Sequence, residues 1–440
     1  MQRRVLALVS VAAALLVAAV GAIAASAASG SGDYTVKPPA IRGPAIGSLQ
    51  GGHLPGVGNH CAPLFGVDFD LACYDPTQIR NAYDVPDTLT GAGQTIVIVD
   101  AYGDPTIEQD LAAFDAFFGL PAPPSFTVFH GSSTEKAGPH AAADWALETA
   151  LDVEWAHAIA PGANIVLAEA PSSSGNAINV TEAQIVSRYP GSILSQSFGI
   201  NENELRGNGN KIQWKQADEN YQRFRDLGIT VLASAGDFGA TTGTSSNTPS
   251  FPSSDPWVTA VGGTQGLPYP YGLCESTATD DCSYGGEQAW NEPDFEVATG
   301  GAPSQLFGVP SYQTGTSDFT TRTTPDVSYN AAVNGGVLVA QGGNFWLVGG
   351  TSAGSPQWAG IFALVNEARA DAGKGPIGFA NPALYGIYNS GSYGADFHDI
   401  TVGDNTLVGA PVAGYDAGPG YDLATGIGTP DVANLVQDLD

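Results

Sequence analysis

One serine hydroxyl lies among small residues in the stretch Gly349-Gly350-Thr351-Ser352-Ala353-Gly354-Ser355-Pro356-Gln357-Trp358-Ala359-Gly360. The apolar run before it, 345–348, predicts a short buried strand, and the apolar residues of 358–365 recur at helical spacing. Ser352 is therefore expected at a strand-to-helix turn, where free backbone amides favour negative charge. That position suits a serine nucleophile, although a plain Gly/Ser turn that caps a core helix has the same pattern.

Apolar strands alternate with helical patterns before this stretch. Strands are predicted at 94–100, 165–168, 192–195, 229–234 and 259–261, with helices at 75–83, 106–118, 141–159, 178–188 and 210–227. Near-continuous apolar strands that alternate with helices indicate an α/β fold, in which helices cover both faces of a mostly parallel central sheet. Functional groups in such sheets gather at the carboxyl ends of the strands.

The N-terminus has the pattern of a secretory signal peptide, residues 1–27. Arg3 and Arg4 precede a long apolar run, and small residues around Ala27 predict the cleavage site. No later run of about 18 apolar residues follows, so we expect a secreted, extracellular protein. Residues 28–75 are rich in glycine and proline and predict an extended arm, whereas 76–440 are expected to form one large domain.

The chain is strongly acidic, with 44 Asp and Glu against 15 Lys and Arg and a formal net charge of -29. Such a surface repels nucleic acid and anionic membranes, so neither is expected as a partner. We expect a monomer. The negative charge can serve solubility, or it can reflect function at low pH, where many carboxyls are neutral. Composition does not distinguish between these two explanations.

The four cysteines form two close pairs, Cys61 with Cys73 and Cys274 with Cys282. In an oxidising compartment this spacing predicts two local disulfides. No CxxC spacing indicates a zinc site.

A second informative stretch is the helical pattern of 144–159, which has little polar surface. Glu148 and Asp152 lie four residues apart and so project from one face as neighbours. Two adjacent buried carboxyls cannot both ionise cheaply, so one holds a proton. The pair can supply a general base and the group that orients it, at a pH where histidine is already cationic. An exposed acidic stripe on a surface helix is the alternative.

Two further stretches carry candidate site residues. Asp237 follows a predicted strand within Ser234-Ala235-Gly236-Asp237, and a protonated carboxyl there could donate a hydrogen bond to an oxyanion; a turn aspartate is the alternative. Near the C-terminus, Asp399-Ile400-Thr401 and the glycine-rich stretch 418–428 combine carboxylates with exposed carbonyls. Such oxygen atoms suit a calcium cage, and an irregular loop without metal has the same composition.

Taken together, these motifs resemble the sedolisin family, serine-carboxyl peptidases with a subtilisin-like fold. The resemblance covers roughly 75–440 and rests on four motifs in order: Glu148-x-x-x-Asp152 with Ala160-Pro161-Gly162-Ala163, Ser234-Ala235-Gly236-Asp237, Gly350-Thr351-Ser352-Ala353, and Asp399-Ile400 with Gly420-Tyr421-Asp422. Four ordered motifs are far more specific than any one of them.

The resemblance implies a Glu-Asp-Ser triad and an acid-active endopeptidase that forms an acyl-enzyme. Ser352 would be the nucleophile, Glu148 the base and Asp152 its orienter, with Asp237 the oxyanion partner. It also implies one calcium ion bound by the carboxylates of Asp399 and Asp422 and the carbonyls of Ile400, Gly418 and Gly420. An extended peptide or protein substrate would pair with the strand edge at Ser197, Phe198 and Gly199.

Two features depart from the family pattern. The serine motif continues Gly354-Ser355-Pro356, where members commonly place prolines directly after the Ser-Ala pair, a change we expect to be tolerated. Family precursors usually carry a long folded prosegment, and 28–75 is too short for one. We therefore expect no full prosegment.

Three alternatives remain. A histidine-type subtilase would use Asp100, His130 and Ser352, but the residues after His130 lack a helical pattern. Gly350-Thr351-Ser352-Ala353-Gly354 also fits the nucleophile elbow of α/β-hydrolases, whose histidine would have to be His398. The third is a secreted, non-catalytic binding protein on a peptidase scaffold.

Overall fold

The computed structural model describes residues 33–48, 58–63, 70–131, 139–207, 210–266 and 284–440. All of them belong to one compact unit, Asp33–Asp440. The predicted signal peptide and the pair Cys274 and Cys282 lie outside the described residues. In the described part of the chain, no helix is both long enough and apolar enough to span a membrane.

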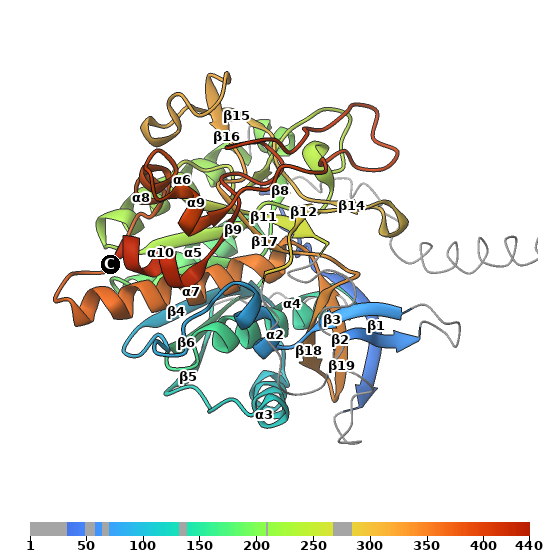
Figure 1. The fold of residues 1–440 in the computed structure, drawn as a ribbon, viewed down its shortest axis with the longest axis vertical. Helices are drawn as coiled ribbons and strands as arrows, with labels where there is room; N and C mark the ends of the chain where they lie inside the picture. The colour runs from blue at the N-terminus through green and yellow to red at the C-terminus, as the bar shows by residue number, and fades with distance from the viewer. Residues whose placement is uncertain (1–32, 49–57, 64–69, 132–138, 208–209, 267–283) are drawn as a thin grey trace, which may run out of the picture. The chain divides into compact units, whose positions relative to one another are not determined.

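The central sheet is mostly parallel (Figure 1). Its strand order is β12-β11-β9-β7-β4-β6-β5, and β17 also pairs with β11. All pairs are parallel except that of β12 with β11. The strands are β4 (Thr95–Ala101), β5 (Phe126–His130), β6 (Asn164–Ala170), β7 (Ile193–Gln196), β9 (Thr230–Ser234), β11 (Thr259–Gln265), β12 (Gln288–Ala289) and β17 (Val327–Asn330).

Helices cover both faces of this sheet, which confirms the predicted α/β fold. Alternate residues of β4 point to opposite faces: Ile96 and Ile98 pack with helices α4 (Pro139–Ile159) and α7 (Thr351–Asp371). Val97 and Val99 pack in a second core with α5 (Gly175–Val186) and α6 (Asn210–Asp226). Because both faces are buried, the middle of β4 is a continuous apolar run, Ile96 to Val99.

A second, five-stranded sheet has the order β1-β19-β18-β3-β2. It contains β1 (Ile41–Ser48), β2 (Gly58–Pro63), β3 (Asp70–Tyr74), β18 (Gly336–Gln341) and β19 (Asn344–Gly349). The described part of 28–75 therefore differs from the arm that we predicted, because its strands pair with the chain. The partners of β1 and β3 lie near residue 340, and a local pattern carries no sign of them.

The remaining elements are short or peripheral. The helices are α2 (Pro76–Ala82), α3 (Ile107–Phe118), α8 (Asn381–Tyr388), α9 (Tyr393–Asp396) and α10 (Val432–Leu439). The strands are β8 (Ile200–Asn201), β10 (Ser250–Phe251), β13 (Asn291–Glu292), β14 (Val297–Ala298), β15 (Pro303–Gly308), β16 (Thr321–Thr323), β20 (Phe397–His398) and β21 (Thr429–Pro430).

Helices α4 and α7 pack closely at Gly360. A Cβ atom on Gly360 would lie 2.6 Å from Cβ of Ile159 and 3.2 Å from the carbonyl oxygen of Ala156. Only a residue without a side chain allows this approach. The contact fixes the spacing of two helices, one of which carries Glu148 and Asp152 and the other Ser352.

Replacing this glycine should therefore separate the two helices. We expect Gly360→Ala to lower the free energy of unfolding by about 1–3 kcal/mol, the usual cost of overpacking. Gly386 is the matched control: it is an exposed glycine within α8 whose Cβ would have no neighbour within 4 Å. Gly386→Ala should raise the free energy of unfolding by up to about 1 kcal/mol. Denaturant unfolding measures both, and equal effects would contradict the close contact.

Candidate active site

Ser352 is the second residue of α7, directly after β19, as the sequence predicts. Gly350 caps the helix with φ 117°, a conformation that favours glycine, and a Cβ atom there would lie 2.4 Å from Oδ2 of Asp237. The Ser352 side chain is fully buried, and its Oγ makes no hydrogen bond to a described residue. A buried hydroxyl without a partner is available to a neighbouring base.

Pro356 lies within the first turns of α7 and removes one helical hydrogen bond. Its nitrogen cannot donate to the carbonyl oxygen of Ser352, four residues earlier. The hydroxyl of Ser197 donates to that oxygen instead, at 3.3 Å. The backbone of the candidate nucleophile is thus tied to the strand edge that follows β7.

Glu148 and Asp152 are neighbours on α4, and both are fully buried. Oε2 of Glu148 accepts a hydrogen bond of 3.1 Å from the backbone nitrogen of Ala40. The hydroxyl of Ser352 lies against Glu148, although neither this hydroxyl nor Oε1 of Glu148 completes a hydrogen bond with a described residue. The structure therefore brings together the three residues that the sequence predicts as a triad. Because Glu148 and Asp152 are buried, the alternative of an exposed acidic stripe on a surface helix is wrong.

Asp100 joins this group from the end of β4. It is fully buried, and its charge raises the pKa of both Glu148 and Asp152. From the sequence, Asp100 is predicted only as part of the alternative histidine triad. Asp100 lies at the carboxyl end of a predicted parallel strand, where functional groups gather, and this position could have predicted its place near Glu148 and Asp152.

Burial raises the pKa of every carboxyl in the group. For Glu148 and Asp152 the pKa lies well above the usual value, first because of lost solvation and then because of neighbouring carboxylates. The pKa of Asp100 rises to about 7, chiefly through burial. No cation among the described residues lowers the pKa of these three acids, so at acidic pH they hold at least one proton among them.

Asp237 lies on the other side of the nucleophile turn. Its Oδ1 accepts hydrogen bonds from the backbone nitrogen of Thr351, at 2.9 Å, and from the Thr351 hydroxyl, at 2.7 Å. Oδ2 is buried and makes no hydrogen bond to a described residue. Burial raises the pKa of Asp237 to about 7, against the opposing effect of Thr351. Below that pH the free oxygen can carry a proton and donate it.

The predicted substrate edge runs on from β7 through Ser197, Phe198 and Gly199. The Ser197 hydroxyl also lowers the pKa of Asp152, and the Phe198 ring packs against Trp145 with centroids 6.0 Å apart. Gly199 pairs antiparallel with Lys37. In this structure the edge therefore pairs with a segment of the chain itself, and its binding of a substrate stays a prediction.

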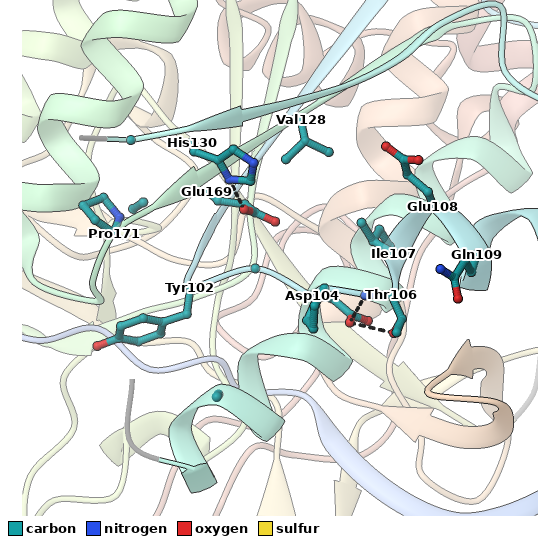
Figure 2. A pocket seen from close by; sticks show the side chains of 15 residues that line it. Tyr102, Asp104, Thr106, Ile107, Glu108, Gln109, Val128, His130, Glu169 and Pro171 are labelled. Atoms are coloured by element: carbon teal, nitrogen blue, oxygen red, sulfur yellow. Dashed lines mark hydrogen bonds and ion pairs between the residues drawn. The ribbon is translucent and has the colours of Figure 1, made fainter. Parts of the chain in front are cut away.

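A cavity of about 810 Å³ opens at the carboxyl ends of β4, β5 and β6 (Figure 2). Nδ1 of His130 lies 2.6 Å from Oε2 of Glu169 in its wall, and the His130 side chain is 74% exposed. The residues that line the cavity include neither Ser352 nor Asp100. The pairing of His130 with Glu169 gives the alternative triad of Asp100, His130 and Ser352 no support.

The predicted calcium residues converge in two loops. The carboxylate of Asp399 accepts a hydrogen bond from the nitrogen of Gly420 at 2.9 Å, and Asp422 accepts one from Gly418 at 2.9 Å. Both carboxylates raise the pKa of Tyr393, so they lie near one hydroxyl. The carbonyl oxygens of Ile400, Gly418 and Gly420 accept no hydrogen bond from any described residue. Two close carboxylates and free carbonyls are a donor set that fits calcium.

Cys73 in β3 is disulfide-bonded. The backbone of Cys61 lies in β2, which pairs with β3, whereas its side chain is outside the described part. The pairing of Cys61 with Cys73 stays a prediction, as does that of Cys274 with Cys282. His398, the histidine of the esterase alternative, stacks on Tyr284 with centroids 3.5 Å apart.

The comparisons with known proteins agree with this geometry. Residues 130–376 match the family model Peptidase_S8, described as the subtilase family. Kumamolisin from Bacillus sp. (strain MN-32) is 34% identical over 383 residues, which cover 83% of this chain and 63% of kumamolisin. Tripeptidyl-peptidase 1 from Rattus norvegicus is 32% identical over 253 residues, covering 55% of this chain and 42% of that protein.

A solved structure shares the fold over nearly its whole length. It is Pseudomonas sedolisin, a serine-carboxyl proteinase complexed with two molecules of pseudo-iodotyrostatin, with a TM-score of 0.71 and 26% identity. The match covers 84% of this chain and 98% of that one. This chain spans less than two thirds of the length of kumamolisin and tripeptidyl-peptidase 1. By its family match, its relatives and its fold, the chain belongs to the subtilase family and, within it, to the sedolisins.

Proposed function

We propose that this protein is a secreted, acid-active serine-carboxyl endopeptidase that cleaves peptide bonds through an acyl-enzyme on Ser352. The observation that carries the proposal is the buried carboxyl of Glu148 against the free hydroxyl of Ser352, with the unbonded Oδ2 of Asp237 near the same turn. A base, a nucleophile and a proton donor for an oxyanion are the parts that acyl transfer needs.

In the proposed reaction, Glu148 accepts the proton of Ser352 as Oγ attacks the substrate carbonyl carbon. The protonated Asp237 donates a hydrogen bond from Oδ2 to the oxyanion. Asp152 and Asp100 orient the Glu148 carboxyl and influence its protonation. Glu148 then gives the proton to the leaving amine. Water hydrolyses the ester with Glu148 again as the base, which restores Ser352.

The pKa of Asp237 supports activity at acidic pH. Its carboxyl holds a proton below about pH 7 and loses it above, because burial raises its pKa to about 7. An ionised Asp237 cannot donate to an oxyanion and would repel it. Activity should therefore be lost as the pH rises through about 7. The same reasoning favours the low-pH explanation of the acidic composition.

The strand edge at Ser197, Phe198 and Gly199 supports an extended peptide as the substrate, bound by backbone pairing. We propose internal cleavage, although several relatives are named tripeptidyl-peptidases. The described part of the chain also supports one structural calcium ion, held by Asp399 and Asp422 with the three free carbonyls. Calcium there would neutralise two carboxylates and hold the two loops together.

The catalytic roles can be tested with a peptide that is acetylated at its N-terminus and amidated at its C-terminus. Ser352→Ala and Glu148→Gln should each reduce kcat by about 10⁴-fold, since residues of a triad act as a unit. Mass spectrometry of the products at acidic pH measures the loss.

Internal cleavage by the wild type supports an endopeptidase, because a tripeptidyl-peptidase needs a free N-terminus. A fully retained rate in Glu148→Gln, with loss in His130→Ala, would move the base to His130. No cleavage by the wild type would favour the binding protein.

The role of Asp237 predicts a difference between two variants. Asp237→Asn keeps a hydrogen-bond donor, so kcat should fall by less than about 100-fold, whereas Asp237→Ala should lose about 10²–10³-fold. An amide does not ionise, so the fall in rate near pH 7 should disappear in Asp237→Asn. The profile of kcat against pH measures this. A wild-type fall that persists unchanged in Asp237→Asn would assign it to another group.

The calcium proposal predicts a change in stability that needs no assay of activity. Calcium at 100 times its Kd should raise the free energy of unfolding by about 2.7 kcal/mol, and EDTA should remove that gain. Asp399→Ala should melt at the same temperature with calcium as with EDTA. A wild-type Tm that calcium and EDTA leave unchanged would reject the site.

A further inference from the structure

Three titratable side chains form a row across neighbouring strands of the central sheet. In the register of the sheet, Asp100 of β4 lies beside Glu169 of β6, and Glu169 lies beside His130 of β5. Adjacent strands are about 4.8 Å apart, so residues that pair in register on one face are direct neighbours. We call these three residues the carboxyl-end row, because each is the last or the next-to-last residue of its strand.

The carboxyl-end row lies on the face of the sheet that α4 covers. The residues two positions earlier in the three strands, Ile98, Leu167 and Val128, belong to or pack against the core that contains α4. Side chains alternate between faces along a strand, so the row points to this same face. The end of the row in β4 therefore lies beside the carboxyls of Glu148 and Asp152, whose pKa values Asp100 raises.

Exposure to solvent increases along the row. Asp100 is fully buried, the Glu169 side chain is 10% exposed, and the His130 side chain is 74% exposed. Glu169 and His130 line the cavity of Figure 2, whereas Asp100 does not. The charge at the exposed end of the row can therefore be changed without opening the buried group.

The Glu169 carboxyl is held between two partners. Oε2 lies 2.6 Å from Nδ1 of His130. Oε1 lies against Gly103, which has a φ of 73°, and a Cβ atom on that residue would collide with this oxygen. The turn after β4 therefore leaves room for the Glu169 carboxyl because residue 103 is a glycine.

His130 favours the ionised form of this carboxyl. Burial raises the pKa of Glu169, His130 lowers it through its charge and its hydrogen bond, and the charge of Asp104 raises it. Histidine carries a positive charge at acidic pH. The described residues that line the cavity include no lysine or arginine, and the exposed Glu108 there is a further acid.

Acids surround the row from the other elements packed against it. The described carboxyls that act on Asp100, Glu169 or the catalytic base are Glu148 and Asp152 of α4, Asp237 of the turn after β9, and Asp104 of the turn after β4. Among all these described groups, His130 supplies the positive charge.

An ionised Glu169 affects where a proton lies among the buried acids. Burial is the main cause of the raised pKa of Asp100, the Thr149 hydroxyl lowers this pKa, and the charge of Glu169 raises it. An ionised Asp100 in turn raises the pKa of Glu148. A proton on Asp100 therefore removes one of the charges that would make Glu148 hold a proton itself.

We propose that Glu169 is a positioning residue: paired with His130, its carboxylate keeps a proton on Asp100 and so leaves Glu148 ionised as the base. This inference rests on the proposed function. His130 acts here as a cation at the surface, whereas in the alternative triad it would take the proton of the serine.

The profile of kcat/KM against pH for the blocked peptide tests this role. Its acid limb, where the rate rises as the base ionises, reports the protonation of Glu148 in the free enzyme. Glu169→Gln should move this limb up by about 0.5–1 pH unit, because Asp100 then ionises more readily and its charge favours a proton on Glu148.

Glu108→Gln is the matched control for Glu169→Gln. It removes an acid from the same cavity, but Glu108 lies on α3, outside the row. The acid limb should stay in place in this variant. A limb that stays in place in Glu169→Gln, or that moves equally in both variants, would overturn the proposal.

Two variants of His130 separate charge from packing. His130→Asn keeps a hydrogen-bond donor without the charge, so the acid limb should move up as it does in Glu169→Gln. His130→Lys keeps a cation and should restore the limb to near its wild-type position. A structural role alone would lower kcat at every pH and leave the limb unmoved in His130→Asn, a result that would contradict the proposal.

A further measurement needs no activity. Infrared difference spectra follow the carbonyl band of a protonated carboxyl as the pH changes, and Asp100→Asn identifies the band of Asp100 by its loss. The pH at which Asp100 gives up its proton should fall by about 0.5–1 unit in Glu169→Gln. An unchanged pH would overturn the proposal.

Together, the rate and the infrared band distinguish this inference from the proposed function. A wild type that cleaves the blocked peptide, with an acid limb that Glu169→Gln leaves in place, would overturn the inference and leave the peptidase intact. A wild type that cleaves nothing, with a band that Glu169→Gln does move, would overturn the peptidase and support the placement of the proton on Asp100.

Discussion

The close packing of α4 on α7 is the constraint on which the site depends. At Gly360 the two helices approach so closely that a single methyl group would collide with Ile159. One helix brings the acids and the other brings the serine, from positions about two hundred residues apart. The distance between Glu148 and Ser352 is thus set by a contact in the apolar core, away from the solvent.

The acids of the candidate site are buried in the interior of the protein. Glu148, Asp152, Asp100 and Asp237 are all fully buried, and burial is the first cause of every raised pKa among them. In neutral solution such a group would carry repelling charges in a medium that solvates them poorly. At low pH the carboxyls share protons, so Asp237 can donate a hydrogen bond, and the proposed role of Glu148 needs it to be the carboxyl that stays ionised. A histidine would be charged there, which explains why acids replace it.

Much of this could be predicted from the sequence. The helix of Glu148 and Asp152, the turn of Ser352 and the parallel strands follow from apolar periodicity, and the structure confirms them. The pairing of β1 with β19 and of β3 with β18 could not be predicted, because these partners lie far along the chain. The apolar run of β18, by contrast, carries the pattern of a buried strand in the sequence itself. The contact of Ala40 with Glu148 depends on a register that no local pattern contains.

Pro356 makes the backbone of Ser352 depend on the strand edge at Ser197. Since the proline leaves the carbonyl of Ser352 without its helical partner, that oxygen depends on Ser197, which belongs to the edge where a strand binds. A strand that pairs with Gly199 therefore contacts the segment 197–199, whose Ser197 hydroxyl bonds to the first turn of α7. Under the proposed function, a peptide that pairs poorly along this edge would leave Ser352 less well aligned, and selectivity would appear in kcat as well as in KM.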